Sequence, residues 1–402
     1  MTQAVAVEPL RDGLADERAA LALYVHWPFC ISKCPYCDFN SHVRDKVDQQ
    51  AWRQALLQDL AYEAQLTRGH RLGSIFFGGG TPSLMPPETV ARIIEAAGDH
   101  WEFAENIEIT LEANPSSVES ARFADLALAG INRVSLGLQS LDDERLRFLG
   151  RAHDLDEGLA ALDIARRTFD RASIDLIYAL PDQDEAAWLA ELQRALDFGT
   201  DHLSLYQLTI EPGTRFATLA AKGELLPLSP ERSAALFELT RDITTAAGRP
   251  AYEISNHARP GQESRHNLAY WRYHNYCGVG PGAHGRRGDT VTQRHRKPEN
   301  WLASVARHDN GISEEVPLTP PEMAAEAMLM GLRLYEGVDL DWIADRTCLP
   351  VEAFVDRGKV GLLQQNGLLD LDGTLLRVTA SGALLLDAIL AEIVRLPVDS
   401  AA

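Results

Sequence analysis

A chain of 402 residues with 46% hydrophobic and 24% charged side chains is long enough to bury one large core and a smaller one. Its 38 Lys and Arg against 58 Asp and Glu give a formal net charge of -20, which repels phosphate backbones and argues against nucleic acid as a partner. Its five cysteines, three of them close together, do not fit a disulfide framework and favour metal or redox chemistry.

The first 20 residues are predicted to form an N-terminal tail. They carry acidic side chains and no long apolar core, so we expect neither a signal peptide nor a transit peptide. No run of about 18 apolar residues follows, which argues against a membrane-spanning helix. Together these features predict a cytoplasmic protein.

Six short β-rich runs come next, and most are followed by turn residues and an amphipathic helical pattern. The runs read as largely apolar on both faces, as expected for parallel strands that are covered by helices. Helices are predicted over residues 86–101, 116–130 and 184–199. This alternation predicts an α/β fold over residues 21–250, either an α/β barrel or a partial (β/α)6 TIM-like barrel. The six runs span residues 21–27, 74–79, 107–113, 131–138, 172–180 and 202–210.

The alternation of strand and helix patterns ends after residue 211. Residues 251–314 are predicted to form a connecting segment that is basic and rich in aromatic residues. Residues 253–299 hold eight Lys or Arg and four Asp or Glu, a net charge of +4 in an acidic chain. Such a segment would suit a flat aromatic dianion, an acidic partner or a cover over the barrel mouth. Its interleaved aromatic residues are Tyr252, Tyr270, Trp271, Tyr273 and Tyr276.

Residues 315–395 are predicted to form a small winged-helix-like α+β domain. Thr319 is a plausible N-cap for a helix in which Met323, Ala327, Met330 and Leu334 recur at helical spacing, and this stripe is expected in the core. Asp372-Gly373 stands between two apolar runs and predicts a hairpin, which a last helix follows. Residues 315–402 contain 14 acidic and 6 basic residues, so the DNA-binding role of winged helices is disfavoured.

Polar residues gather where the six runs end. The three clustered cysteines follow the first run, the string "GGGTPS" ends the second, and Glu112 and Gln139 end the third and fourth. Asp175 lies within the fifth run, where a buried carboxylate needs a cation or hydroxyl donors. The alternative to a role in a site is a purely structural one, in which Asp175 pairs with an internal Arg. Since a parallel barrel places its site at the carboxyl ends of its strands, we expect a cofactor or catalytic site there.

Cys30, Cys34 and Cys37 have the spacing C-x3-C-x2-C, which puts three sulfurs on one tight loop. A 4Fe-4S cluster normally has four cysteine ligands, so three would leave one iron open to a cofactor. A structural zinc site is the rival interpretation, and it would need His26 or His42 as a fourth ligand with unusual spacing.

The strings "CISKCPYC" and "GGGTPS" together resemble the cluster and glycine motifs of radical S-adenosylmethionine enzymes. The strings "LEANP", "RVSLGLQS", "IDLIYALP", "LYQLTIEPGT" and "YEISNHARPG" resemble those of the oxygen-independent coproporphyrinogen oxidase-like branch, and within it those of the haem chaperones. The resemblance covers roughly residues 20 to 395 and implies an incomplete barrel with a C-terminal winged-helix-like domain.

The resemblance also implies roles for individual residues. The cluster ligands would be Cys30, Cys34 and Cys37, and S-adenosylmethionine would lie beside Tyr24, Tyr36, Gly79, Gly80, Thr81, Glu112, Gln139, Arg151 and Asp175. In that assignment Gly80 leaves room for the ligand's amino group and Arg151 pairs with its carboxylate. One string departs from the family: where relatives commonly read "YGLPGQT", this chain has "YALPDQD" at residues 178–184.

Two further features separate the functions found in this branch. Phe39 stands two places after the third cysteine, where the oxidases carry one more cysteine, and "HNLAYW" at residues 266–271 resembles a motif of the chaperones. His266 could contact or ligate haem, although a lone histidine more often has a structural role. We therefore predict a haem chaperone that delivers haem to a haemoprotein acceptor.

Two other functions stay open at this point. The first alternative is a coproporphyrinogen III dehydrogenase, and a DNA-binding regulator that senses iron-sulfur status is disfavoured by the acidic C-terminal domain. Peripheral contact with membrane-bound haemoproteins and a homodimer are also left open by the sequence.

Overall fold

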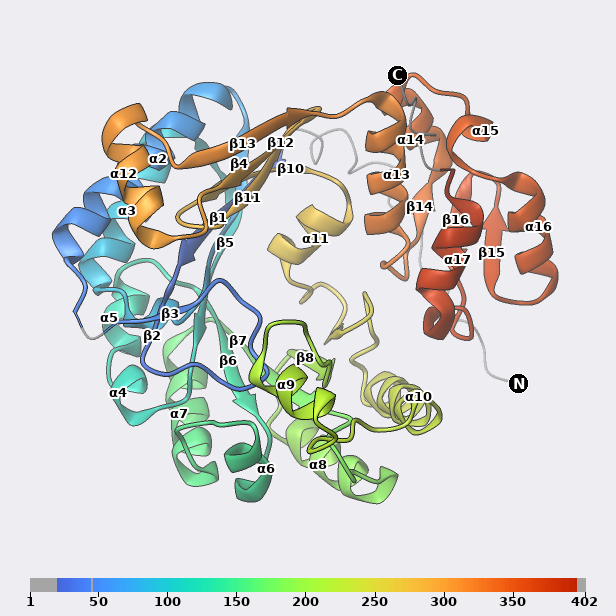
Figure 1. The fold of residues 1–402 in the computed structure, drawn as a ribbon, viewed down its shortest axis with the longest axis horizontal. Helices are drawn as coiled ribbons and strands as arrows, with labels where there is room; N and C mark the ends of the chain where they lie inside the picture. The colour runs from blue at the N-terminus through green and yellow to red at the C-terminus, as the bar shows by residue number, and fades with distance from the viewer. Residues whose placement is uncertain (1–19, 45, 396–402) are drawn as a thin grey trace.

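The computed structural model describes residues 20–44 and 46–395 (Figure 1). The predicted N-terminal tail, residues 1–19, therefore lies outside the described residues. An eleven-stranded sheet forms the larger part, in the order β13-β12-β11-β10-β1-β4-β5-β6-β7-β8-β9. The six predicted runs are confirmed as its six consecutive parallel strands. They are β1 (Ala20–Trp27), β4 (Arg71–Gly79), β5 (Glu102–Ala113), β6 (Arg133–Gln139), β7 (Arg171–Tyr178) and β8 (His202–Gln207).

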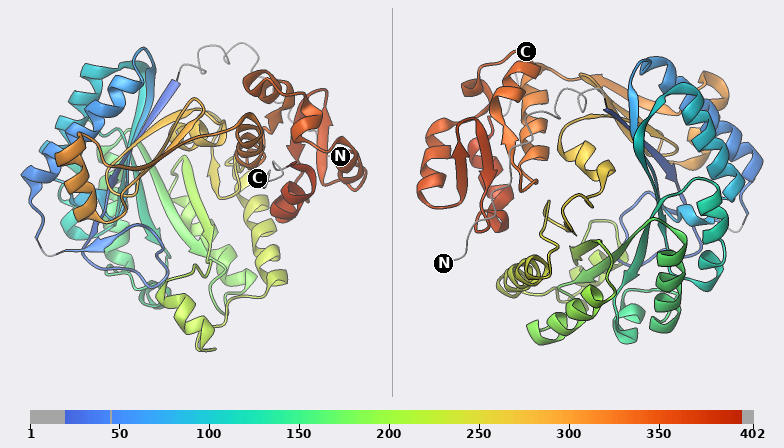
Figure 2. Two further views of the ribbon diagram at one scale, coloured as in Figure 1. Left: turned by 45° about the horizontal axis from the view of Figure 1, so that its top comes forward. Right: turned by 180° about the vertical axis from the view of Figure 1, so that it is seen from behind.

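Helices cover the outer side of this curved sheet, as Figures 1 and 2 show. The predicted helices at 86–101 and 184–199 are α3 (Pro87–His100) and α8 (Glu185–Asp197), whereas the stretch at 116–130 forms two short helices instead of one. The strand order is that of an open sheet, which confirms a partial barrel. The remaining helices of this part are α2 (Gln49–Leu66), α4 (Ser117–Ser120), α5 (Phe123–Leu128), α6 (Asp143–Phe148), α7 (Leu155–Thr168), α9 (Arg215–Ala221) and α10 (Pro230–Ala246).

The parallel strands have one apolar and one largely polar face. In β1, Leu23 and Val25 belong to the main hydrophobic core, whereas the alternate residues Tyr24 and His26 face the inside of the barrel. The expectation that both faces are apolar is therefore wrong. The reason is the period of a strand: only every second side chain packs under the helices, and the other set is free to line a site.

Residues 251–314 add five strands to the sheet. Strand β10 (Asn275–Val279) pairs in parallel with β1 on the side away from β4. Strands β11 (His284–Arg287), β12 (Thr290–Arg294) and β13 (Ile312–Pro317) continue it as an antiparallel meander. Strand β9 (Asn256–Ala258) pairs with β8, helix α11 (Arg265–Trp271) crosses the inner side of the sheet, and α12 (Pro298–His308) follows β12.

Buried ion pairs hold the meander against α2. Arg294, which is fully buried, donates to Asp59 at 2.7 Å and to Glu63 at 2.8 Å, and Arg287 contacts the same Glu63 at 3.0 Å. Removing one partner of such a pair leaves a buried charge and typically costs about 3–5 kcal/mol. Much of the positive charge noted in this segment is thus compensated inside the protein.

The C-terminal domain has the predicted mixture of helices and a small sheet, in the order β14-β16-β15. Thr319 forms a capping box with Glu322 at the start of the first helix, and the β15/β16 hairpin turns at Gly373-Thr374, directly after Asp372. Met323, Ala327 and Leu334 are buried as expected, and Met330 packs against the same core while also lining a cavity. The elements are α13 (Pro320–Gly331), β14 (Val338–Asp339), α14 (Leu340–Thr347), α15 (Val351–Phe354), α16 (Arg357–Gln365), β15 (Leu369–Asp372), β16 (Leu375–Val378) and α17 (Leu386–Ile393).

The unusual string "YALPDQD" keeps a backbone that glycine would favour. Ala179 and Asp182 adopt positive φ angles of 57° and 61°, at the two positions where the related string has glycine. Such a conformation costs a side-chain-bearing residue of order 1 kcal/mol or more. Asp184 caps α8 by accepting a hydrogen bond from the Ala187 amide at 2.8 Å. Ala179 and Asp182 therefore adopt the backbone conformation that glycine would take without this cost.

No helix in residues 20–44 and 46–395 combines the length and the apolar character that a membrane crossing needs.

Candidate functional site

Cys30 is the last residue of the short strand β2 (Phe29–Cys30), and Cys34 and Cys37 lie on the loop that follows it. This cysteine loop leads to β3 (His42–Val43), which pairs with β2 in parallel. The Cys37 amide donates to the Cys34 carbonyl at 3.2 Å, which closes a tight turn around Pro35 and Tyr36. All three thiols are partly exposed and unpaired. The loop can therefore present three sulfurs to one ligand.

The end of β4 supports this loop from below. The Gly80 amide donates to the Trp27 carbonyl at 2.7 Å and the Thr81 amide to the Phe29 carbonyl at 2.9 Å. A Cβ atom on Gly80 would stand 2.8 Å from the Phe29 carbonyl oxygen and 3.0 Å from the Cys30 sulfur. The lack of a side chain at Gly80 is thus needed for contact with the cysteine loop, not only for room beside a ligand.

Arg151 connects the cysteine loop to the sheet. One guanidinium nitrogen lies 3.5 Å from the Cys34 sulfur and 3.4 Å from the Tyr36 hydroxyl, and the other donates to Asn114 Oδ1 at 2.5 Å and the Gly137 carbonyl at 3.1 Å. Its Nε atom is buried without a hydrogen-bond partner among the described residues. Arg151 is therefore held in place with one donor still free.

The surroundings of the thiols bear on their chemistry. Burial raises the pKa of Cys30 and of Cys37, and the Thr81 hydroxyl, which donates to the Cys30 sulfur at 3.4 Å, opposes the rise at Cys30. A bound iron would supply the positive charge that the thiolates need. In the described part of the chain no three His, Cys, Asp or Glu side chains converge on one point as a single metal ion requires, whereas a 4Fe-4S cluster binds its cysteines through separate irons.

His26 was one of the two fourth ligands proposed for a rival zinc site, the other being His42. Its Nε2 atom bonds to the Asn40 carbonyl at 3.0 Å, so Nε2 carries the proton and Nδ1 accepts from the Tyr24 hydroxyl at 3.1 Å. Burial lowers the pKa of His26 to about 4. Since both ring nitrogens are engaged, His26 does not serve as the fourth zinc ligand in this arrangement.

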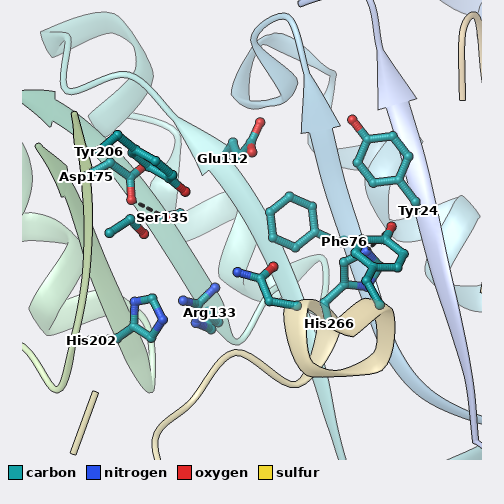
Figure 3. A pocket seen from close by; sticks show the side chains of 12 residues that line it. Tyr24, Phe76, Glu112, Arg133, Ser135, Asp175, His202, Tyr206 and His266 are labelled. Carbon is teal, nitrogen blue, oxygen red and sulfur yellow. Dashed lines mark hydrogen bonds between the residues drawn. The ribbon is translucent and has the colours of Figure 1, made fainter. Parts of the chain in front are cut away.

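A cavity of about 190 Å³ lies inside the barrel (Figure 3). Its wall includes the inward residues of the six parallel strands β1 and β4 to β8, and His266 and Tyr270 of α11 close it on one side. The lining residues are Tyr24, Phe76, Glu112, Arg133, Ser135, Asp175, His202, Ser204, Tyr206, His266, Asn267 and Tyr270. Several of these, such as Arg133 and Tyr206, were missed by the sequence reading, although the alternation along each strand could have identified them.

Two carboxyl groups, those of Glu112 and Asp175, face this cavity, and neither forms an ion pair within the described residues. Asp175 accepts from the Ser135 hydroxyl at 2.9 Å, so hydroxyl donors offset it, as one of the two expectations had it. Glu112 accepts from the Gly79 amide at 3.1 Å. Burial, with Asp175 nearby, raises the pKa of Glu112 to about 8, and burial also raises the pKa of Asp175. The pair can accept a ligand that brings positive charge or hydroxyl groups.

His266 is built into the wall of the same cavity. Its Nδ1 atom lies 3.0 Å from the Ser74 hydroxyl, its Nε2 atom lies 2.7 Å from the Tyr270 hydroxyl, and its ring stacks on Phe76 at 4.9 Å between centroids. The side chain is 1% exposed, and burial lowers its pKa to about 3. Both nitrogens are engaged, so the geometry favours a structural role for His266.

A second cavity, of about 500 Å³, extends from the barrel towards α13. Tyr24 and Glu112 belong to both cavities, and Gly79 and Phe39 line the second one. The far part of its wall comes from α11, β10, β11, β12 and α13, through Tyr270, Trp271, Tyr276, His284, Arg286, Gln293, Arg296 and Met330. His284 was not singled out by the sequence reading, because no spacing pattern marks it.

Thr81 and Gln139, which were also predicted for the site, differ in where they lie. Thr81 links Cys30 to Asn114, whose amide donates to the Thr81 hydroxyl at 3.3 Å. Gln139 lines neither cavity: it has a positive φ of 67°, and its amide nitrogen lies against Gly137. The structure thus brings the cysteine loop, Gly80, Thr81 and Arg151 together, with Tyr24, Glu112 and Asp175 beside them.

These residues fit the groups that the motifs imply. The loop offers three sulfur donors, Arg151 keeps a free buried donor, and Glu112 and Asp175 offer two carboxyls that form no ion pair within the described residues. A 4Fe-4S cluster needs thiolate ligands, and S-adenosylmethionine brings a carboxylate, an ammonium, a sulfonium and ribose hydroxyls. The donor set at the strand ends therefore matches both groups.

Comparisons with known proteins agree with this arrangement. Residues 24–195 match the model of the radical SAM superfamily, and residues 318–385 match that of the HemN C-terminal domain. A solved structure of coproporphyrinogen III oxidase (HemN) from Escherichia coli, a radical SAM enzyme, superimposes with a TM-score of 0.77 and 25% identity, over 94% of this chain and 90% of that chain.

Relatives of similar length are also found among known sequences. The mitochondrial radical S-adenosyl methionine domain-containing protein 1 of Bos taurus is 41% identical over 92% of this chain and 86% of its own. The heme chaperone HemW of Haemophilus influenzae is 36% identical over 92% of this chain and 97% of its own, and HemW of Escherichia coli is 42% identical over 66% and 70%. The chain therefore belongs to the radical SAM superfamily, in its HemN-like branch, and resembles the haem chaperones called HemW.

Proposed function

We propose that this protein is a haem chaperone, which binds haem, a 4Fe-4S cluster and S-adenosylmethionine and delivers haem to a haemoprotein acceptor. Support comes from relatives that carry the name HemW and from the second cavity, whose aromatic and basic wall suits a flat dianion. Its volume of about 500 Å³ lies in the range of cofactor sites, whereas the first cavity is smaller than that range.

The observation that carries the proposal is the place of Phe39. This residue stands where the oxidases have an additional cysteine, it is 59% exposed, and its ring lines the second cavity. A phenyl ring adds apolar surface for a porphyrin but cannot transfer a proton or a hydrogen atom as a thiol can. The cavity is thus suited to holding a porphyrin without acting on it.

In this proposal the residues at the strand ends hold the cofactors. Cys30, Cys34 and Cys37 would ligate the cluster, and Arg151 would hold the carboxylate of S-adenosylmethionine with its free Nε donor. Glu112 and Asp175 would face its cationic and hydroxyl groups. The bound cluster supplies an electron donor next to S-adenosylmethionine. The proposed location remains the cytoplasm, although some relatives are mitochondrial.

The proposal is tested by titrating the reconstituted protein with haem and, in parallel, incubating it anaerobically with coproporphyrinogen III, S-adenosylmethionine and a reductant. We expect a Soret band that saturates at stoichiometric haem and no protoporphyrinogen IX. Catalytic formation of protoporphyrinogen IX would instead establish the alternative, a coproporphyrinogen III dehydrogenase, which the likeness to HemN favours. Absence of saturable haem binding would refute the chaperone function.

Replacing Arg151 by Ala is expected to raise the Kd for S-adenosylmethionine about 10- to 100-fold, since hydrogen bonds to a charged group contribute about 1.5–3 kcal/mol. Isothermal titration calorimetry with reconstituted protein measures this change. Arg147→Ala is the matched control, because Arg147 is exposed on α6 and contacts the backbone of its own helix. An unchanged Kd in Arg151→Ala would place the ligand's carboxylate elsewhere.

The affinity for S-adenosylmethionine should also rise with pH between 6 and 8. The pKa of Glu112 is raised to about 8 in the protein without a ligand, so its carboxyl is neutral through most of this range. A cationic ligand favours the carboxylate, so binding releases a proton below pH 8 and tightens by up to about tenfold per pH unit.

The control for this pH dependence is Glu112→Gln, which keeps the size and removes the titration. Calorimetry of both proteins across the same pH range cancels the titration of the ligand itself. If the two profiles were parallel, Glu112 would not face the cation.

A further inference from the structure

We infer that the second cavity binds haem through the imidazole of His284 as an axial iron ligand, with the guanidinium of Arg296 next to a propionate. This inference rests on the proposed function and assigns the haem ligand to a residue outside the motif "HNLAYW". It places the porphyrin at the far part of the cavity, between β11, α11 and α13.

The state of His284 carries the assignment. It is the first residue of β11, its side chain lines the cavity and is exposed, and it has no hydrogen-bond partner among the residues that the structure describes. His26 lines the same cavity and His266 the smaller one, but in each of them both ring nitrogens already bond to protein groups. A metal ligand needs a free nitrogen lone pair, and His284 can offer one without breaking an existing bond.

The wall around His284 is suited to a porphyrin ring. Tyr270 and Tyr276 meet edge to face at 4.5 Å between centroids, and Trp271 continues the aromatic surface. Met330 and Phe39 add apolar side chains from α13 and the cysteine loop. A flat aromatic ligand gains dispersion and apolar burial against such a surface.

The charges around His284 fit the propionates of haem. Arg287 and Arg294 are paired with acidic residues of α2, but Arg296 is exposed at the cavity and makes no ion pair within the described residues. Arg286 is 2% exposed, it lies over the Tyr273 ring at 3.5 Å, and its Nε atom has no partner in the described part of the chain. Arg286 is already paired, with Glu326 at 3.7 Å and with the His274 carbonyl at 2.9 Å. Arg296 is therefore the guanidinium at the cavity that can pair with a carboxylate of the ligand.

The test compares haemin with metal-free protoporphyrin IX on the cluster-loaded protein. An axial ligand contributes only when iron is present, so the wild type should bind haemin more tightly than protoporphyrin IX. In His284→Ala we expect the affinity for haemin to fall about tenfold or more, with a shifted Soret band, while the affinity for protoporphyrin IX stays unchanged. Added imidazole should restore the wild-type spectrum.

Two matched variants complete the test. His308→Ala removes an exposed histidine at the end of α12 that lines neither cavity, and it should bind haemin as the wild type does. Arg296→Ala should weaken binding of haemin but not of its dimethyl ester, which lacks the carboxylates.

The outcomes separate this inference from the proposed function. If His284→Ala binds haemin with the affinity and spectrum of the wild type, the assignment of the ligand is overturned while haem binding stands. If His266→Ala alone abolishes the spectral signature, the ligand is His266 and the inference is equally wrong. If the wild type binds neither haemin nor protoporphyrin IX, the proposed function itself fails.

Discussion

Replacing any one of Cys30, Cys34 or Cys37 by Ala is expected to abolish stable assembly of the iron-sulfur cluster. With three ligands on one loop and no replacement thiol in contact with it, loss of one sulfur leaves two irons of the cubane without a protein ligand. Anaerobic reconstitution of the wild type should give about four irons per chain with a brown chromophore. Each variant should give a colourless protein with iron close to background.

The other two cysteines provide the controls. Cys277 is fully buried in β10, beside the Thr67 hydroxyl, and Cys348 is exposed at the end of α14. Alanine at either position should leave the iron content unchanged, although Cys277→Ala removes core volume and costs some stability. Tight binding of one zinc ion without iron uptake would contradict the cluster assignment, as would loss of iron in Cys348→Ala.

The sequence predicted some parts of the fold and of the candidate site but not others, and particular residues show why. The six strands follow from local pattern, because β-branched and apolar runs bounded by turns carry their own signal. Strand β10 escaped prediction, since its pairing with β1 joins residues about 250 positions apart and leaves no local trace. The meander beyond it depends on Arg294 meeting Asp59, a contact that no spacing rule contains.

The candidate site shows the same division. The cysteine loop and the glycine string are short motifs, so the sequence alone indicated a cluster beside the ends of β1 and β4. The roles of single side chains could be assigned only from the fold. His266 is hydrogen-bonded to both Ser74 and Tyr270, whereas His284, which no motif marks, lines the larger cavity without a hydrogen-bond partner among the described residues. Burial and partners, which decide whether a histidine is available, are properties of packing.

Replacing Gly80 by Val is expected to abolish S-adenosylmethionine binding and to reduce the iron content, without unfolding the barrel. The Cβ atom would stand 2.8 Å from the Pro28 carbonyl carbon and the Phe29 carbonyl oxygen, and these backbone atoms cannot move away as a flexible side chain could. The cysteine loop must therefore shift, and overpacking of this kind costs about 1–3 kcal/mol or more. Calorimetry, iron analysis and thermal unfolding measure the three effects.

Gly361→Val is the matched control, since a Cβ at Gly361 meets no atom within 4 Å and the residue lies on α16 of the C-terminal domain. It should keep iron and affinity for S-adenosylmethionine, with a small loss of helix stability. Gly80 lacks the positive φ of Gly79, so backbone strain does not contribute and the effect must come from the clash with the loop. Full iron content and unchanged affinity in Gly80→Val would show that the loop lies farther from β4 than the structure places it, and the cofactor site would have to be sought away from this strand end.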